Sequence, residues 1–402
     1  MANSPKICTA GLEKRRVLYF YLHVIGGKPV YNEYEYRFLD TVCRNYQVTV
    51  VFFAQSENVS HLTGVFPSSA QLMPVRELTL PTHVPTLMRL IVENLGRILK
   101  TALIVRTTKP DLVCGNWITR SSGFYCALSF FHPFLAVAWG SDVLIEAKRS
   151  PILRILGRVT MRAADAVIVD SEIQCRAVLQ LGCKPSKIYS FPWGIDLQRF
   201  KPEKSTEARD RLGWSNQKIV LSTRKHLPVY GVEYLLRAIQ LMKPAKGTKF
   251  IIAGDGPLLT RHKSLAKELG IEDDVRFLGW VPNEELPMFL NAASIYVSTS
   301  FSDGASASLM EAIACGLPVV VTDIPANREW ITDGENGLLV PPGDSTALAT
   351  AITRALKDPE LRARMRLANL KLAQERADWN RNLKTLERCI SDLLANVNCR
   401  TS

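Results

Sequence analysis

Two carboxylates stand eight residues apart in the segment FSDGASASLMEAIACG, residues 301–316. Asp303 lies in a run of glycine, alanine and serine, and Glu311 lies in an apolar stretch of helical character. Small residues from Ala305 to Ser308 would leave backbone N–H groups uncovered at the positive end of that helix, which suits a phosphate. The segment therefore predicts an anion site with one acid in the loop and a second about two turns into the helix.

A simpler interpretation is that the two acids only cap the helix. Capping explains neither the second acid nor the uncovered N–H groups, so the binding interpretation is favoured. Such sites lie beyond the carboxyl ends of strands in open α/β sheets. The strand-like run ASIYVSTS, residues 293–300, comes directly before the segment and meets this requirement.

Strand-like runs alternate with helical runs along the chain, which is typical of doubly wound parallel sheets. One series of alternating strand-like and helical runs precedes the charged segment 197–215, and a second series follows it. We therefore expect an α/β protein with an N-terminal Rossmann-like domain (1–200), a C-terminal one (201–370) and a helical tail (371–402) that crosses back to the first. The expected strands are 15–22, 47–54, 110–116, 134–142, 164–171 and 187–196, then 217–225, 249–257, 275–282, 293–300, 318–323 and 337–344.

Composition and net charge limit the classes of molecule that the protein is expected to bind. The chain has 402 residues, 47% hydrophobic and 22% charged, as in a folded protein, and a formal charge of +12 that calls for an anionic partner. No basic run interleaved with aromatics stands out, so we expect no nucleic acid. The nine cysteines form no C-x-x-C, and neither His-x-His nor Asp-x-Asp occurs. We therefore expect reduced thiols, a cytoplasmic location, and neither a metal nor a resident cofactor.

No signal peptide or membrane span is expected. The first residues, MANSPKICTAGLEKRR, lack an apolar core. The most apolar stretch, 123–139, is interrupted by His132 and Pro133, so we interpret it as a buried helix followed by a strand.

A longer pattern carries a resemblance. Acid-x7-acid is followed by A-x-A-C-G-x-P-V-V-x-T-D and then by NGLLVPPGD, residues 336–344. This pattern resembles the retaining family 4 glycosyltransferases, which have the GT-B fold of two Rossmann-like domains with a cleft between them. The resemblance extends from Val17 to Leu356 and is densest from Arg224 to Asp344.

The resemblance implies a role for each residue of the segment. Glu311 would bind the ribose hydroxyls of a nucleotide sugar, and Asp303 would hold hydroxyls of the transferred sugar. The helix start would receive the diphosphate through the donor-binding residues Ala305, Ser306, Ala307 and Ser308. Members of the family usually have glutamate at the first acid position, so the shorter Asp303 leaves the donor sugar open.

A second resembling element is LSTRKHLPVYGVEYLL, residues 221–236. Family members have an arginine and then a lysine here, both on the donor phosphates. Arg224 matches the arginine, but Tyr230 stands where the lysine is expected. Lys225 or His226 would restore the cation, or the phenol would donate a hydrogen bond instead. The alternative is a solvated basic turn.

Further donor-side residues follow from the resemblance. Gly254 and Gly256 stand in the loop AGDGP, and Val281 lies near the end of the next expected strand, 275–282. Gly27, with Gly26, follows the first strand, where glycine permits close approach to a donor. On the acceptor side, Trp139 of WGSD replaces a histidine common in relatives.

Asp142 ends the same WGSD motif. We assign it to the acceptor side together with Trp139. A buried structural aspartate is an equally supported alternative.

The segment 85–100 is a basic amphipathic helix in the sequence. Its apolar positions could lie on an anionic membrane, beside a lipid-linked acceptor. The alternative is that the apolar stripe packs into the core. The positions concerned are Leu87, Leu90, Ile91, Leu95 and Ile98, with Arg89, Arg97 and Lys100 elsewhere on the helix.

The resemblance thus implies a metal-independent glycosyltransferase. It would move a hexose-type sugar from a nucleoside diphosphate donor, of UDP or GDP type, to a hydroxyl of a glycan, lipid or small-molecule acceptor, with retention. The catalytic residues would be Arg224, Lys225 and Asp303. The alternatives are another GT-B enzyme, such as an epimerase or a phosphorylase, and a non-catalytic or nucleic-acid-binding subunit.

Overall fold

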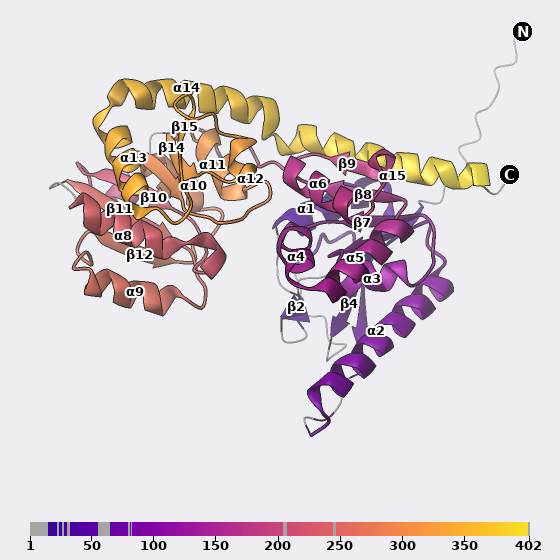
Figure 1. Cartoon of the computed structure of the whole chain (residues 1–402). Helices are drawn as coiled ribbons and strands as arrows, with labels where there is room; N and C mark the ends of the chain where they lie inside the picture. The colour runs from indigo at the N-terminus through magenta and orange to yellow at the C-terminus, as the bar shows by residue number, and fades with distance from the viewer. Residues whose placement is uncertain are drawn as a thin grey trace, which may run out of the picture. The chain divides into compact units, whose positions relative to one another are not determined.

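Apolar runs of the sequence form the strands of two parallel sheets (Figure 1). This computed structural model describes residues 15–21, 24–25, 28–29, 33–54, 65–78, 81, 83–203, 207–243 and 247–400. The chain divides into two units. The first comprises Met1–Val169, Ala177–Tyr189 and Thr385–Ser402, and the second comprises Asp170–Arg176 and Ser190–Lys384.

The first unit contains a seven-stranded sheet in the described residues, in the order β5-β4-β1-β6-β7-β8-β9. Neighbours from β5 to β8 pair in parallel. The edge strand β5 was not expected from the sequence, because it contains Pro74, which is tolerated at a sheet edge. The strands are β1 (Arg16–Phe20), β4 (Gln47–Ala54), β5 (Gln71–Arg76), β6 (Leu112–Asn116), β7 (Phe134–Val137), β8 (Ala166–Val169) and β9 (Ile188–Ser190), with a separate pair β2 (Val24–Ile25) and β3 (Lys28–Pro29).

Helices connect these strands. The stretch 123–139 does form a buried helix followed by a strand, as predicted, because α3 ends at Ala127 and β7 begins at Phe134. Among the residues described, no helix is both long enough and apolar enough to span a bilayer. The helices are α1 (Glu33–Asn45), α2 (Thr86–Thr108), α3 (Ser121–Ala127), α4 (Ala147–Arg149), α5 (Pro151–Ala163) and α6 (Glu172–Gln180), with a π-helical turn at Asp142–Glu146 and the long α15 (Trp379–Arg400).

The second unit contains a six-stranded parallel sheet in the order β12-β11-β10-β13-β14-β15. Its strands are β10 (Lys218–Ser222), β11 (Thr248–Ala253), β12 (Val275–Gly279), β13 (Ile295–Ser298), β14 (Val319–Thr322) and β15 (Gly337–Val340). Its helices are α7 (Glu207–Leu212), α8 (Val232–Met242), α9 (Leu259–Glu268), α10 (Leu286–Ala292), α11 (Ala307–Ala314), α12 (Pro325–Arg328), α13 (Ser345–Lys357) and α14 (Pro359–Arg376). The predicted α/β class with two parallel sheets is confirmed.

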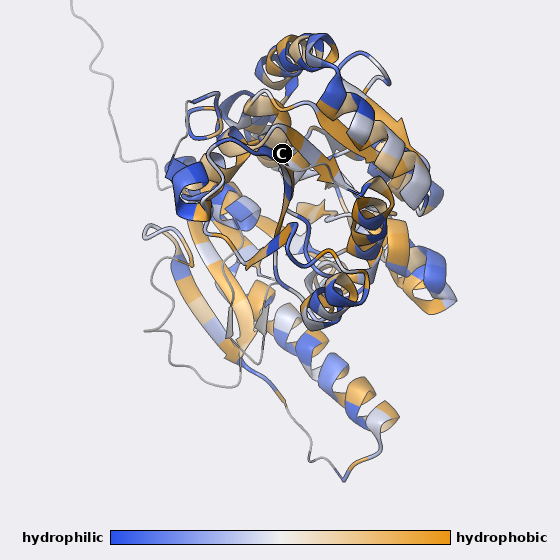
Figure 2. Cartoon of the chain, turned by 90° about the vertical axis from the view of Figure 1, so that its left-hand side faces the viewer, coloured by the Kyte–Doolittle hydropathy of each residue, from blue (hydrophilic) through white to orange (hydrophobic). Residues whose placement is uncertain are grey.

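Helices cover both faces of the second sheet, so its strands are buried on both sides. Successive strand residues point to opposite faces. Val220 therefore belongs to the core cluster beneath α8 and α13, and Leu221 belongs to the cluster beneath α11. Figure 2 shows the matching pattern, with strands mostly hydrophobic and helices carrying both colours.

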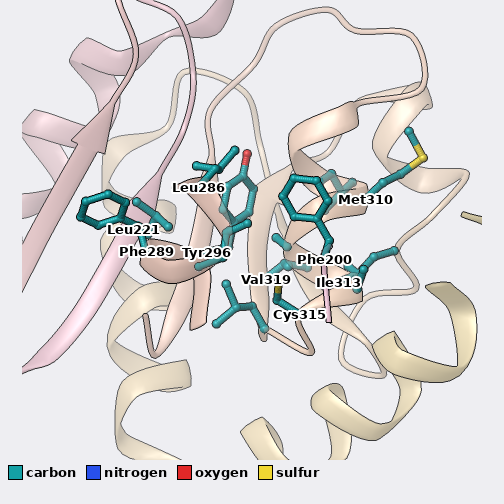
Figure 3. Packing of buried hydrophobic residues seen from close by; sticks show 14 of the residues in the cluster. Phe200, Leu221, Leu286, Phe289, Tyr296, Met310, Ile313, Cys315 and Val319 are labelled. Carbon is teal, nitrogen blue, oxygen red and sulfur yellow. The ribbon is translucent and has the colours of Figure 1, made fainter. Parts of the chain in front are cut away.

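The helix α11 is held against the sheet by its apolar side. Met310 and Ile313 are fully buried in the same cluster as Tyr296 and Val319 (Figure 3). This packing fixes where the helix begins, and hence where its N-terminal N–H groups lie.

Truncation of Ile313 should loosen that packing. We expect Ile313→Ala to lower the free energy of unfolding by about 2–5 kcal/mol, because the variant loses buried methyl groups and leaves a cavity. Urea denaturation followed by tryptophan fluorescence measures the change. The control is Leu367→Ala on α14, where the side chain is 72% exposed and a small effect is expected. Equal losses in the two variants would contradict this view of α11.

Candidate functional site

Several polar side chains of the second unit meet at one edge of its sheet. Arg224 follows β10, and Asp303 lies in the loop between β13 and α11. Because β10 and β13 are parallel neighbours, their carboxyl ends open at the same edge. The structure therefore brings together the arginine and the first acid that the sequence predicted.

Arg224 makes a short ion pair with Asp303, with Nη2 2.6 Å from Oδ2. Its Nη1 donates to the Oγ atoms of Ser306 and Ser308 at 2.9 and 2.6 Å. Only 6% of Arg224 is exposed. A solvated basic turn, the alternative weighed for this arginine, does not describe a guanidinium with these contacts.

The charge of Arg224 is stabilised by its surroundings. Burial lowers the pKa of Arg224, but the Asp303 carboxylate, with smaller contributions from Tyr296 and Tyr230, raises it by more, so the pKa lies above its usual value. Among the described residues, its buried Nε has no hydrogen-bond partner. This guanidinium therefore stays charged and retains one buried N–H that a ligand could use.

Tyr230 contacts Arg224, and its role in place of the expected lysine stays a prediction. The Arg224 Cζ atom lies 4.1 Å from the centroid of the Tyr230 ring, a cation–π contact. The short 3₁₀ turn Pro228–Tyr230 carries this ring, and the Tyr230 carbonyl accepts a hydrogen bond from Thr299 Oγ1 at 2.8 Å. The ring covers one face of the guanidinium and holds its plane.

The two residues suggested as the missing cation, Lys225 and His226, have different surroundings in the structure. Lys225 is exposed. His226 is fully buried, and its Nδ1 lies 2.6 Å from Nδ1 of His262. Burial and the neighbouring His262 lower the pKa of His226 to about 4, so it is neutral at pH 7. The suggestion that His226 restores the cation is therefore wrong, whereas that for Lys225 stays a prediction.

The start of α11 differs in one respect from the expectation. Ser306 is the N-cap residue, but its side chain accepts from Arg224 instead of capping the helix. The first intrahelical hydrogen bond runs from the Met310 N–H to the Ser306 carbonyl, so the N–H groups of Ala307 and Ser308 precede it. The Ala305 N–H is not uncovered, because it donates to Asp170 Oδ1 at 3.1 Å.

Asp170 was missed by the sequence interpretation. Its carboxylate also accepts from Gln174 Nε2 at 2.6 Å, and an added Cβ at Gly304 would lie 2.8 Å from Oδ1. Burial, with the nearby Asp303 and Glu329 carboxylates, raises the pKa of Asp170 to about 7. The available signal was an acid directly after the buried run AVIV of β8.

Gly254 and Gly256 bring a loop against the Arg224 segment. Both have positive φ angles, of 139° and 149°. A Cβ at Gly254 would lie 2.5 Å from the Arg224 carbonyl, and one at Gly256 would lie 2.6 Å from the His226 carbonyl. The glycines are thus needed for backbone packing behind the arginine, and their contact with a donor stays a prediction.

The remaining donor-side residues have simpler surroundings. Glu311 lies on α11 and is half-buried. Val281 packs against the cluster beneath α11. Gly27 and its neighbour Gly26 lie outside the described residues.

In the first unit, Asp142 is fully buried. Its carboxylate accepts from the backbone N–H groups of Ile118 at 2.9 Å, Val143 at 2.9 Å and Trp139 at 3.2 Å. Burial raises the pKa of Asp142 to about 6, although these donors oppose the shift. Its contacts favour the structural alternative for this residue.

Trp139 belongs to a buried polar network that the sequence interpretation missed. Its Nε1 donates to Asn116 Oδ1 at 3.0 Å, and Asn116 Nδ2 donates to Glu35 Oε1 at 3.0 Å. Tyr19 also donates to Glu35, at 3.0 Å. Glu35, Asn116 and Tyr19 are fully buried. The tryptophan thus fills a hydrogen-bonding position at the end of β6.

The buried His226–His262 pair predicts sensitivity to acid. With a folded pKa near 4 against about 6.5 in the unfolded chain, His226 contributes stability above pH 6.5 that is lost as the pH falls toward 4. We expect a loss of about 3 kcal/mol over that window. Denaturant titrations at pH 7 and pH 4.5 measure it.

The variant His226→Asn serves as the control for this titration. Buried carboxyls such as Asp170, whose pKa is raised, contribute the opposite slope, so the difference between parent and variant isolates the histidine. Parallel pH curves for parent and variant would show that the pair does not titrate as described.

Comparisons with known proteins agree with this architecture. Residues 25–199 match the family described as Glycosyltransferase Family 4, and residues 204–371 match Glycosyl transferases group 1. The GDP-mannose-dependent alpha-(1-6)-phosphatidylinositol monomannoside mannosyltransferase of Mycolicibacterium smegmatis is 31% identical over 47% of this chain and 52% of its own. A D-inositol 3-phosphate glycosyltransferase of Acidothermus cellulolyticus is 31% identical over 54% and 51%. The chain spans about half the length of the curated relatives it matches.

Solved structures share the fold along nearly the whole chain. Anabaena HepE in complex with UDP superposes with a TM-score of 0.76 at 20% identity, covering 94% of this chain and 100% of the other. Sucrose-phosphate synthase of Thermosynechococcus elongatus gives 0.76 at 20% identity, with 95% and 100% covered. At this identity the likeness concerns the fold alone. Two glycosyltransferase family models match successive parts of the chain, and the fold is that of the solved neighbours. The chain therefore belongs to the family 4 glycosyltransferases of the GT-B fold.

Proposed function

We propose that the protein is a glycosyltransferase that moves a hexose-type sugar from a nucleoside diphosphate donor to an acceptor hydroxyl, with retention. The observation that carries the proposal is the convergence of Arg224, Ser306 and Ser308 at the start of α11. A fixed cation beside a helix N-terminus is suited to a diphosphate. The donor is of UDP or GDP type: one relative is named for GDP-mannose, and a structural neighbour was solved with UDP.

The diphosphate would bind between Arg224 and the N–H groups of Ala307 and Ser308. The guanidinium has an unused Nε–H, and its two serine contacts can be exchanged for phosphate oxygens. The Ala305 N–H would become available to the phosphate if Asp170 withdraws. All of these groups are donors, so their contacts strengthen as negative charge develops on the leaving diphosphate.

Asp303 and Glu311 would divide the rest of the donor. Glu311, further along α11, accepts from the ribose hydroxyls. Asp303 accepts from hydroxyls of the transferred sugar, and its ion pair holds Arg224 beside the phosphate. The same carboxylate therefore orients both the sugar and the cation that stabilises the leaving group.

The chemical step would rely on leaving-group stabilisation. Because the pKa of Arg224 is raised, its charge persists across the pH range in which enzymes work. We propose front-side attack by the acceptor hydroxyl on the anomeric carbon: the new C–O bond forms as the bond to the diphosphate breaks, and the hydroxyl proton passes to the leaving phosphate oxygen. Lys225 acts as a second cation, and no metal or covalent intermediate takes part. Lys225 is exposed, and its side chain would turn toward the diphosphate when the donor binds.

The first unit would bind the acceptor, with Trp139 at the end of the buried network through Asn116. A lipid-linked, glycan or small-molecule hydroxyl fits this proposal. The lipid class gains support from the relative named for phosphatidylinositol monomannoside. We propose a cytoplasmic enzyme that works in part at the inner face of the membrane.

A donor screen tests the proposal. Nucleotide sugars of the UDP and GDP types are tested for thermal stabilisation, and those that stabilise are then tested for turnover with membrane lipid extracts and simple sugars. We expect one donor to be consumed only in the presence of an acceptor, with the anomeric configuration retained. Donor isomerised without an acceptor would indicate an epimerase, and phosphorolysis of a glycan would indicate a phosphorylase.

Substitution of the two acids should separate binding from chemistry. Asp303→Asn should slow transfer by on the order of a hundredfold, the scale seen when a positioned polar group is lost. Its affinity for the bare nucleoside diphosphate should be nearly unchanged, because the bare diphosphate lacks the sugar that Asp303 contacts and its own charge replaces the carboxylate as the partner of Arg224. Glu311→Gln should weaken the bare diphosphate, since the ribose contact is lost. Calorimetry measures both affinities, and equal losses in the two variants would exclude this division of roles.

Tyr230 should act through its ring rather than its hydroxyl. Tyr230→Phe keeps the face against Arg224 and should change diphosphate affinity less than threefold, on the order expected for an unaltered cation–π contact. Tyr230→Leu should weaken affinity roughly 5- to 30-fold, because it removes that contact. If Phe and Leu weaken binding equally, the hydroxyl is the group that matters.

A further inference from the structure

The helix α2 of the first unit carries its large apolar side chains outward. Five of them recur at intervals of four residues, so successive members are neighbours about 40° apart around the axis and form a stripe that winds along the helix. Each is more than half exposed: Leu87 71%, Ile91 55%, Leu95 57%, Leu99 65% and Leu103 61%. Met88 and Leu90 add to it, at 59% and 49%. Of the apolar positions named from the sequence, Leu87, Leu90, Ile91 and Leu95 are exposed and Ile98 is half-buried, so the alternative that they pack into the core is wrong for four of the five.

The opposite side of α2 holds the helix to its unit. Thr101 and Val105 are buried, and Arg97 pairs with Glu77 at 2.9 Å. Lys100 Nζ donates to the Arg76 carbonyl. The side of α2 that faces its unit is therefore already packed and paired. The apolar stripe is exposed although the helix is docked in its place.

A second helix on the same side of the sheet adds positive charge. The helix α3 packs against both α2 and α5, so α2 and α5 flank it. The sequence of α5, PILRILGRVTMRA, contains no acidic residue. Its exposed positions include Ile152 (69%) and Ile155 (57%), together with Arg154, Arg158 and Arg162. Lys148 and Arg149 precede it.

We propose that the stripe of α2 and the outer side of α5 together form a docking surface for an anionic lipid bilayer. The α2 stripe would lie parallel to the membrane, with its apolar side chains at the boundary between headgroups and acyl chains. The arginines of α5 would contact the anionic headgroups. Glycosyl transfer by the second unit's site is not needed for this inference, which concerns a separate surface.

Charge and shape favour a bilayer over a second copy of the chain. A second copy of the chain would present the same basic residues to this surface, whereas an anionic bilayer complements them. From Met88 to Leu103 the stripe runs about 22 Å at 1.5 Å per residue. An exposed apolar face of this length beside basic residues suits an anionic interface with an apolar interior. In Figure 2, α2 shows hydrophobic segments along its length.

The test is sedimentation of the full chain with lipid vesicles. Vesicles of equal parts phosphatidylglycerol and phosphatidylcholine should bind the protein, and added salt should release it. Pure phosphatidylcholine should bind it at least tenfold more weakly. Leu95→Ser combined with Leu99→Ser should reduce binding to anionic vesicles by tenfold or more.

Neutralisation of α5 tests the charge contribution separately. Arg154→Gln, Arg158→Gln and Arg162→Gln combined should reduce binding to anionic vesicles by roughly a hundredfold, at about fivefold per arginine, and abolish the preference for them. The matched controls lie in the second unit. Leu367→Ser changes an exposed leucine of α14, and Arg261→Gln, Lys263→Gln and Lys267→Gln combined remove three exposed charges of α9. Both controls should bind as the parent does.

Vesicle binding by the α2 and α5 variants that equals that of the parent would overturn the proposal. So would a protein dimer in sedimentation velocity that the Leu95 and Leu99 substitutions dissociate, since the surface would then join two copies. Nucleotide sugar consumption with a soluble acceptor, measured without vesicles, should be the same in parent and variants. If the parent itself consumes no nucleotide sugar, the proposed function is contradicted, and the docking surface is then judged by sedimentation alone.

Discussion

The candidate site depends on the ion pair between Arg224 and Asp303. A guanidinium that is 6% exposed requires a counterion, because an unpaired buried charge costs several kcal/mol. That counterion comes from the loop before α11, and the same guanidinium also holds two serines at the start of the helix. One charge therefore ties the end of β10 to the loop after β13 and the first turn of α11.

Most of the fold was predictable from the sequence because both sheets are parallel. Parallel strands are buried on both faces and appear as continuous apolar runs, which local inspection detects well. The predicted runs extended past the observed ends: 134–142 became Phe134–Val137, since the polar WGSD motif forms a loop and a π-helical turn instead. The strand β5 was missed because its Pro74 argues against a strand except at an edge.

The candidate site was predictable only where a motif is contiguous. The spacing of Asp303 and Glu311 and the placement of Arg224 at a strand end were enough to expect an anion site. The approach of Asp170 to the Ala305 N–H, 135 residues away, results from tertiary packing that no local pattern encodes. The pairing of His226 with His262 and the contact of Tyr230 with Arg224 were not foreseen either, because spacing along the chain says which residues share an element and not which side chains touch.

The helix α15 has a consequence for the order in which the protein can be completed. Residues from Thr385 onward belong to the first unit, where Arg15 Nη1 donates to the Leu394 carbonyl at 2.6 Å and Tyr189 donates to Asp392 at 2.9 Å. The two partners of the first bond are 379 residues apart. On the ribosome, Leu394 would be added roughly 20–75 s after Arg15. The first unit therefore cannot acquire its last helix until translation has passed through the entire second unit, and until then the surface that α15 covers is open to chaperones.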